Sequence, residues 1–319
     1  MLLKLIKLYF HQFQGLNDVA IGVSRALNLI HAFCHASTPL NDNSTRCMYQ
    51  IRLTFGPTGK ASGAVFSLYQ LEKWCISLSD DHRSNFGILY YFYDAMEARG
   101  KLQDFKLPPE RKLRYLRDGI SGYSNRCASD KRNNHRENIN IFEKIDEIMI
   151  LMEFNDAAES IWKILSAILL IGEISFIINT DNEADVDDMK LSSFVAELLG
   201  LDQKKFVWSL TNYCLIRNGE AIRHKYSCEE ALLARDILAC TLYQRLVDWI
   251  INFINLKLSV TRTLFGSKYL ISILDFFGFE CFTYNKVEQL IVNTVNEQLQ
   301  CYYNQRVFIS EMVRYLYLF

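Results

Sequence analysis

Residues 275–280 form the segment best suited to phosphate chemistry. They read Asp-Phe-Phe-Gly-Phe-Glu, so two carboxylates, Asp275 and Glu280, flank the small residue Gly278. The run before them, 269–274, is short, apolar and rich in strand formers, which predicts a buried central strand. Ligands of open α/β sheets bind beyond the carboxyl ends of strands, where an Asp can hold Mg²⁺ and a glycine N–H can approach a phosphate. So short a pattern often arises by chance, so it needs support from a second segment.

A second segment, 41–46, combines hydroxyl groups with a cation. Asn41 is followed by the adjacent hydroxyls of Ser44 and Thr45 and then by Arg46. A hydroxyl can ligate Mg²⁺ or bond a phosphate oxygen, and a guanidinium offers a planar fork to an anion or a carboxylate. The alternative is an ordinary turn, because loops rich in Asn and Ser are usually turns.

The surrounding pattern predicts a mixed α/β chain organised as one domain. Ser227 and Glu230 have the spacing of a helix capping box, Gly172 is placed to end a helix, and apolar residues at 242, 246, 249, 250 and 253 form one stripe. Residues 38–44 and 121–140 are predicted to be polar loops. Helices are expected at 1–13, 17–36, 86–98, 142–172 with breaks, and from 227 onward, and strands at 49–55, 63–69 and 269–274, with a turn at 56–59 joining the first two.

Taken together, the two segments resemble the motor domain of myosins. Residues 41–46 are similar to switch I of that family, N-x-x-S-S-R, and residues 275–280 to switch II, D-x-x-G-F-E. Longer matches follow in family order. Residues 86–91 resemble N-F-H-I-F-Y-Y, residues 165–176 resemble L-A-A-I-L-H-L-G-N-I-x-F, and about 286–310 resemble the start of the relay helix. The span of about 60–260 resembles the upper 50K region, and the amino-acid sequence of 90–115 is most similar to that of class III myosins.

The resemblance implies an α/β fold of the phosphate-loop NTPase type, with a few central strands and many helices. It implies an actin-based motor that hydrolyses ATP with Mg²⁺ and acts in the cytoplasm on the cytoskeleton. In such a motor Arg46 and Glu280 would pair to close the site and position the attacking water, and the Gly278 N–H would bond the γ-phosphate. The alternative for Arg46 and Glu280 is two unrelated surface charges.

The remaining nucleotide contacts are implied in the same way. Asn41 and Ser44 would contact the nucleotide and its γ-phosphate. Thr45 would supply the hydroxyl ligand of Mg²⁺, and Asp275 would hold the metal's ligand shell.

Two departures from the family pattern bear on activity. No G-x-x-x-x-G-K-[ST] phosphate loop occurs in the 319 residues, although 1–13 resemble the helix that follows that loop in the family. Because the loop supplies backbone N–H groups and a lysine to the phosphates, we expect these residues alone to be inactive. Met48 stands where the family has a glycine just after switch I, a replacement that bears on how the loop moves. The converter, the lever and the light-chain sites would follow residue 319.

Actin filaments are the partner that the resemblance implies. Residues 215–226 resemble the family's cardiomyopathy loop, in which Arg217, Arg223 and Lys225 are the candidates to face acidic actin. An ordinary charged loop is the alternative for the same residues. Two further readings of the chain are a non-catalytic module that binds actin or another partner, and the product of a truncated gene.

Composition narrows the remaining choices. The net charge of -1 gives no indication of a nucleic-acid partner. No apolar run is predicted to span a membrane. The nine cysteines occur singly and no secretory leader precedes them, which predicts a reduced, cytosolic chain. His31, Cys34 and His35 have spacing that zinc could use, but substituted family positions are the favoured interpretation. With only three strands expected, we predict an exposed sheet edge and poor solubility.

Overall fold

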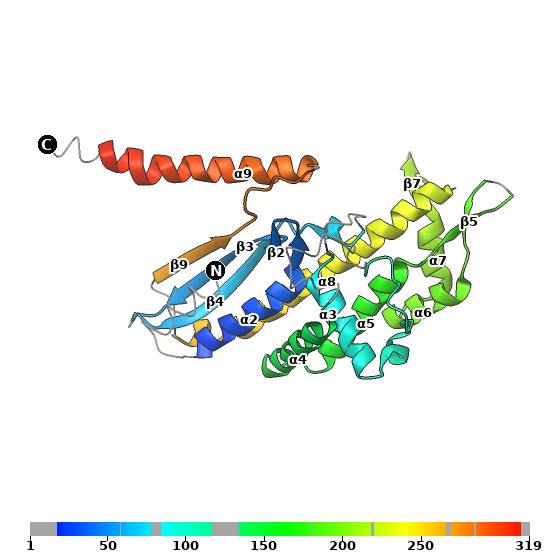
Figure 1. Cartoon of the computed structure of the whole chain (residues 1–319), viewed down its shortest axis with the longest axis horizontal. Helices are drawn as coiled ribbons and strands as arrows, with labels where there is room; N and C mark the ends of the chain where they lie inside the picture. The colour runs from blue at the N-terminus through cyan, green and yellow to red at the C-terminus, as the bar shows by residue number, and fades with distance from the viewer. Residues whose placement is uncertain are drawn as a thin grey trace.

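The computed structural model describes residues 18–57, 59–77, 84–116, 134–180, 182–217, 220–265, 269–283 and 285–313. The helix expected at 1–13 and the loop expected at 121–133 lie outside these residues. Two long helices, α2 (Asp18–Cys34) and α8 (Cys228–Phe265), run beside a three-stranded sheet, and the other helices of the core continue along α8 away from it (Figure 1). The mixed α/β class is therefore as expected.

The sheet brings the two candidate segments together. Its strands are β3 (Met48–Phe55) in the centre, β4 (Ala61–Tyr69) and β9 (Tyr269–Asp275), in the order β4-β3-β9, and both pairs are antiparallel. The expected hairpin at 49–69 is confirmed, and Gly59 in its turn has a φ of 77°, a conformation that favours glycine. Because Asp275 pairs with Tyr49, the end of β9 lies beside the residues that precede β3.

The position of β9 corrects one expectation. It is a strand, as predicted, but it lies at an edge of the sheet and not in a buried centre. Tyr269, Leu270, Ile271 and Leu274 are all exposed, and among the described residues no strand pairs with the outer edge. A run of strand formers specifies extended backbone but not what covers it. The predicted exposed edge is present, while poor solubility stays a prediction.

The core beyond the sheet is helical and rich in aromatic residues. The aromatic residues at 90–93 are buried, and Phe92 stacks on Trp162 with ring centroids 5.8 Å apart. Its helices and short strands are α3 (Gly87–Ala98), α4 (His135–Leu151), α5 (Asp156–Ile171), α6 (Met189–Leu199), α7 (Gln203–Thr211), β5 (Phe176–Ile178), β6 (Ala184–Val186), β7 (Asn212–Arg217) and β8 (Glu220–Lys225), with short helices η1 (Lys73–Cys75) and η2 (Leu102–Phe105).

Helix α8 is the longest element of the core. The capping box before it is confirmed: Ser227 N–H donates to Glu230 Oε2 at 2.9 Å, and Glu230 N–H donates to Ser227 Oγ at 3.3 Å. The predicted apolar stripe is only partly buried, because Trp249 is 43% exposed while Ile250 is buried. The span Cys228–Ser259 is long and apolar enough to cross a membrane, but a core helix passes the same test, and 44% of its most apolar window is buried.

Several predicted boundaries were wrong. Residues 38–44, expected as a loop, contribute to a hairpin of β1 (His35–Thr38) and β2 (Asn41–Thr45), so the first helix stops at Cys34. The polar loop expected to run to 140 gives way to α4 at His135.

Gly172 does end α5, but in a right-handed conformation with a φ of -59°. A Cβ added there would lie 2.8 Å from the ring of buried Tyr115, so close packing explains the glycine.

The last helix stands apart from this core. Helix α9 (Val287–Tyr303) continues through a π-helical segment, Asn304–Ile309, and lies to one side of the sheet beyond β9 (Figure 1). It covers most of the span predicted as a relay helix, about 286–310. The segment 276–286, between β9 and α9, carries Glu280.

Candidate functional site

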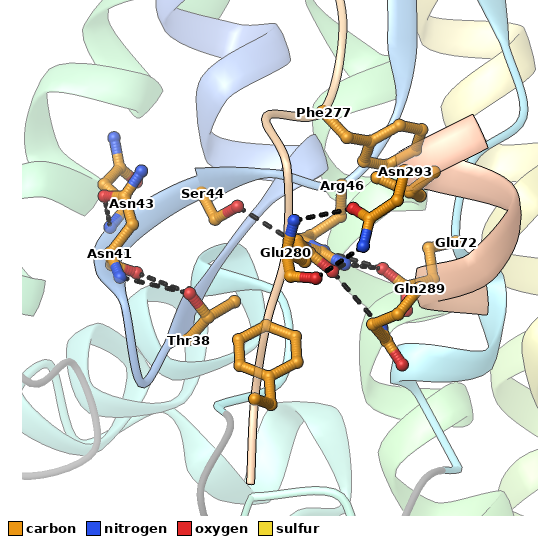
Figure 2. A network of polar contacts seen from close by, with 12 residues as sticks. Thr38, Asn41, Asn43, Ser44, Arg46, Glu72, Phe277, Glu280, Gln289 and Asn293 are labelled. Atoms are coloured by element: carbon orange, nitrogen blue, oxygen red, sulfur yellow. Dashed lines mark hydrogen bonds and ion pairs between the residues drawn. The ribbon is translucent and has the colours of Figure 1, made fainter. Parts of the chain in front are cut away.

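Arg46 is the centre of a buried polar network between β2 and the segment that follows β9 (Figure 2). Its side chain is only 1% exposed. Nη1 donates to Glu280 Oε1 at 2.5 Å and Nη2 to Glu280 Oε2 at 3.5 Å. The two residues are 234 positions apart in the chain, so the structure brings together the pair on which the sequence interpretation depended.

The first turns of α9 hold Glu280 in place. Gln289 Nε2 donates to Glu280 Oε2 at 3.2 Å, and Asn293 bonds both backbone groups of Glu280, accepting from its N–H at 2.8 Å and donating to its carbonyl at 2.7 Å. Asn296 Nδ2 donates to the Phe277 carbonyl at 2.9 Å. The carboxylate is therefore tied by side chain and backbone to α9 (Figure 2).

Glu72 is a member of this network that the sequence reasoning missed. Arg46 Nε donates to Glu72 Oε2 at 2.6 Å, Arg46 Nη2 forms an ion pair with the same oxygen, and Glu72 N–H donates to the Arg46 carbonyl at 2.9 Å. The hairpin offers a signal for the position of Glu72, because its register pairs Met48 at the start of β3 with Tyr69 at the end of β4. Residues just after β4 must then lie beside residues just before β3, which places Glu72 next to Arg46.

The network holds one cation between two carboxylates. Burial by itself would lower the pKa of Arg46, but the nearby carboxylate of Glu72 and the hydrogen-bonded carboxylate of Glu280 raise it above its usual range. Arg46 therefore stays charged. Its guanidinium carbon also lies 5.6 Å from the centre of the Phe277 ring. Because the side chains of all three ionic residues are nearly buried, removing Arg46 would leave two buried carboxylates without a compensating charge.

Thr45 and Asp275 meet beside this network. Thr45 Oγ1 donates to Asp275 Oδ2 at 3.5 Å, and His35 Nε2 lies 3.3 Å from the same hydroxyl. Hydroxyl and carboxylate oxygens are the donor types that Mg²⁺ prefers, so these two side chains fit the predicted metal ligands. Burial and the charge of Asp275 raise the pKa of Tyr49, which faces it across the sheet.

The other predicted nucleotide contacts lie at the edge of the Arg46 network or outside it. Ser44 Oγ accepts from Arg46 Nη1 at 3.0 Å, so Ser44 belongs to the network. Asn41 is engaged in its own turn, where its Oδ1 accepts from Asn43 N–H at 3.0 Å, and Figure 2 shows it apart from Arg46. Gly278 is exposed, and a Cβ added there would meet nothing within 4 Å, which leaves its backbone open to an incoming group.

The candidate actin-facing residues lie on a different part of the molecule. The expected loop is a hairpin of β7 and β8, at the far end of α8 from the sheet (Figure 1). Arg217 ends β7 and is exposed. Arg223 Nε donates to Asn212 Oδ1 at 2.8 Å, and Lys225 Nζ pairs with Glu183 at 2.6 Å.

Metal ligands of other types do not assemble around His31. The rings of His31 and His35 lie 4.3 Å apart, but among the described residues the only His, Cys and carboxylate groups that approach one another as a metal site requires are Asp94, Glu97 and His135. That cluster already contains a cation, because Arg111 Nη1 lies 3.0 Å from Asp94 Oδ1.

Comparison with known proteins identifies the family of the chain. A family profile described as "Myosin head (motor domain)" matches residues 17–317. The chain is 44% identical over 91% of its length to "Neither inactivation nor afterpotential protein C" of Drosophila melanogaster, 36% identical over 91% to Myosin-IIIa of Homo sapiens, and 34% identical over 90% to Myosin-IIIb of Mus musculus. These matches cover 19%, 18% and 22% of the respective relatives, so the chain spans about a fifth of their length. By the profile match and these identities, the chain belongs to the myosin motor-domain family and is similar to its class III members.

Proposed function

We propose that these residues form part of the nucleotide site of an ATP-dependent, actin-based motor of the cytoskeleton. The observation that carries the proposal is the buried contact between Arg46 and Glu280, which joins switch I to switch II. A guanidinium and a carboxylate held in this way can close a site around a terminal phosphate and orient the attacking water, since such catalysis is largely positioning and charge stabilisation. The sheet would belong to a larger one of the phosphate-loop NTPase type.

The other residues take roles that their chemistry supports. Thr45 and Asp275 would hold Mg²⁺, which when bound neutralises charge on the phosphates. Ser44 and Asn41 would contact the nucleotide, and the open backbone at Gly278 would donate its N–H to the γ-phosphate.

The 319 residues by themselves are proposed to be inactive. They contain no phosphate loop of the G-x-x-x-x-G-K-[ST] form, which would supply most of the contacts to the β- and γ-phosphates. Calorimetric titration of the chain with Mg-ATP tests this directly. We expect no binding in the micromolar range, and micromolar binding would contradict the proposal of inactivity.

The role of the site needs a longer protein for its test. We would join the chain to the phosphate-loop segment of a class III relative and to the motor region that follows residue 319, and then measure actin-activated ATP hydrolysis. Arg46→Ala should lower kcat about a hundredfold or more, because it removes both the closing pair and a positioned charge. Glu110→Gln is the matched control, since Glu110 forms only an exposed pair with Lys112. Equal rates for Arg46→Ala and the control would refute the assigned role.

A second candidate function, binding to actin without hydrolysis, is favoured by the β7–β8 hairpin. Leu215, Ile216 and Ile222 are exposed on it, as is Arg217, a mixture of apolar and basic side chains suited to an acidic partner with apolar contacts. Co-sedimentation of the chain with actin filaments, with and without ATP, tests it. Binding that ATP does not change supports this candidate. Absence of binding under both conditions would contradict it.

A further inference from the structure

We propose that Glu72 is the permanent partner of Arg46, and that it keeps the guanidinium paired and in place when Glu280 moves away. The inference rests on the proposed function in one respect, because it treats Glu280 as the side chain that leaves. It assigns to Glu72 a positioning role in the opening and closing of the site.

The guanidinium presents two separate edges, and each edge has its own carboxylate. Glu72 occupies the edge formed by Nε and Nη2, with Nε at 2.6 Å from its Oε2. Glu280 occupies the end formed by Nη1 and Nη2, with Nη1 at 2.5 Å from its Oε1. The two partners therefore do not compete for one position, and either can leave without displacing the other.

The two carboxylates belong to different parts of the molecule. Glu72 follows β4 and precedes η1, its N–H bonds the Arg46 carbonyl at 2.9 Å, and η1 packs on α8. Glu280 lies between β9 and α9, and Asn293 of α9 holds its backbone N–H and carbonyl. Because α9 stands apart from the core (Figure 1), a shift of α9 would carry Glu280 away while Glu72 stayed with Arg46.

The charge balance of the network favours this division of roles. A buried cation left without a partner is strongly unfavourable, which would oppose opening if Glu280 were the only carboxylate. With Glu72 in place, departure of Glu280 leaves one complete buried ion pair. It also removes the second of two carboxylates that share one cation, so like-charge repulsion falls. Glu72 thus makes the Arg46–Glu280 contact easier to break.

Hydrogen exchange of the full chain without nucleotide tests the inference in two variants. In Glu280→Gln, exchange in residues 277–283 should be about tenfold faster because a charged hydrogen bond is lost, while exchange in 41–49 stays within about twofold of the parent because Glu72 still holds Arg46. In Glu72→Gln, exchange in 277–283 should be about tenfold slower, since Glu280 becomes the sole carboxylate partner. Glu72→Asp, which keeps the charge, should return exchange toward the parent rate.

Two controls separate this role from a general effect on folding. Exchange in α5, which contributes no residue to the network, reports whether each variant is folded, and Glu110→Gln controls for loss of an exposed carboxylate. Exchange in 277–283 that is unchanged or faster in a folded Glu72→Gln overturns the inference, and so does a Glu280→Gln variant in which 41–49 and 277–283 respond alike. If Glu72→Gln does not fold, the Glu280→Gln result decides. No nucleotide is used, so failure of Mg-ATP binding in the longer protein would count against the proposed function alone.

Discussion

The Arg46 network and the β7–β8 hairpin use the same kinds of charged side chain in opposite surroundings. Arg46 is almost fully buried and has a carboxylate on each edge of its guanidinium. Lys225 on the hairpin makes a pair with Glu183, in which both side chains are about one-third exposed. Buried pairs are costly to break, whereas exposed pairs contribute little because water screens them. The comparison teaches that burial, more than residue type, decides how much the loss of a charged partner costs.

The largest expected effect is at Arg46. Arg46→Met would leave Glu72 and Glu280 facing each other in a buried site, so the free energy of unfolding should fall by about 3–5 kcal/mol. Urea denaturation of the two proteins measures the difference. Arg99→Met is the control, because Arg99 makes a pair with Asp146 in which both side chains are about one-third exposed, and it should change stability by no more than about 1 kcal/mol. Equal losses in the two variants would show that burial of the network does not matter.

The next effect is at Asn293, which holds the backbone of Glu280. Asn293→Ala should cost about 1–3 kcal/mol locally, since it leaves an N–H and a carbonyl of Glu280 without their partner. Protection of the Glu280 amide in native-state hydrogen exchange is the measurement. Asn293→Asp keeps the acceptor and should lose less. Unchanged protection in the alanine variant would mean that α9 does not hold the segment.

A smaller loss of stability is expected at alkaline pH, and it does not involve Arg46. Burial raises the pKa of Tyr93 to about 12 from its ordinary 10. A folded-state pKa above the unfolded value gives stability that is fully present below pH 10 and is lost as the pH rises through about 12. Thermal unfolding followed at increasing pH should show this decline, and Tyr93→Phe should reduce it. A decline of equal size in Tyr93→Phe would assign it to other groups.

The smallest effect is expected on the hairpin. Lys225→Gln removes the exposed ion pair with Glu183. In that pair, the hydrogen bond to Glu183 raises the pKa of Lys225. We expect the melting temperature of this variant to match that of the parent within error, because solvent already screens the pair. A drop as large as that of Arg46→Met would overturn the contrast between the two regions.

The sequence predicted local features well where short-range chemistry decides them. The capping box at Ser227 and the β3–β4 hairpin with its turn at Gly59 depend on neighbouring residues and appear as expected. Burial was predicted less well: β9 has the composition of a core strand but lies exposed at an edge, and Trp249, within the predicted apolar stripe, is 43% exposed. Whether an apolar face is covered depends on elements that are distant in the sequence. The local pattern of apolar residues does not show where those elements pack.

The sequence alone determined the family of this chain, because motifs at 41–46 and 275–280 and the longer matches between them recur in a set order. It also indicated that Arg46 and Glu280 would meet. Only the tertiary structure decided that Glu72 completes the network and that α9 holds Glu280, because the antiparallel register of β3, β4 and β9 brings these segments together. A buried guanidinium takes its partners from whichever chain segments the sheet places beside it, and that placement is a property of the whole fold.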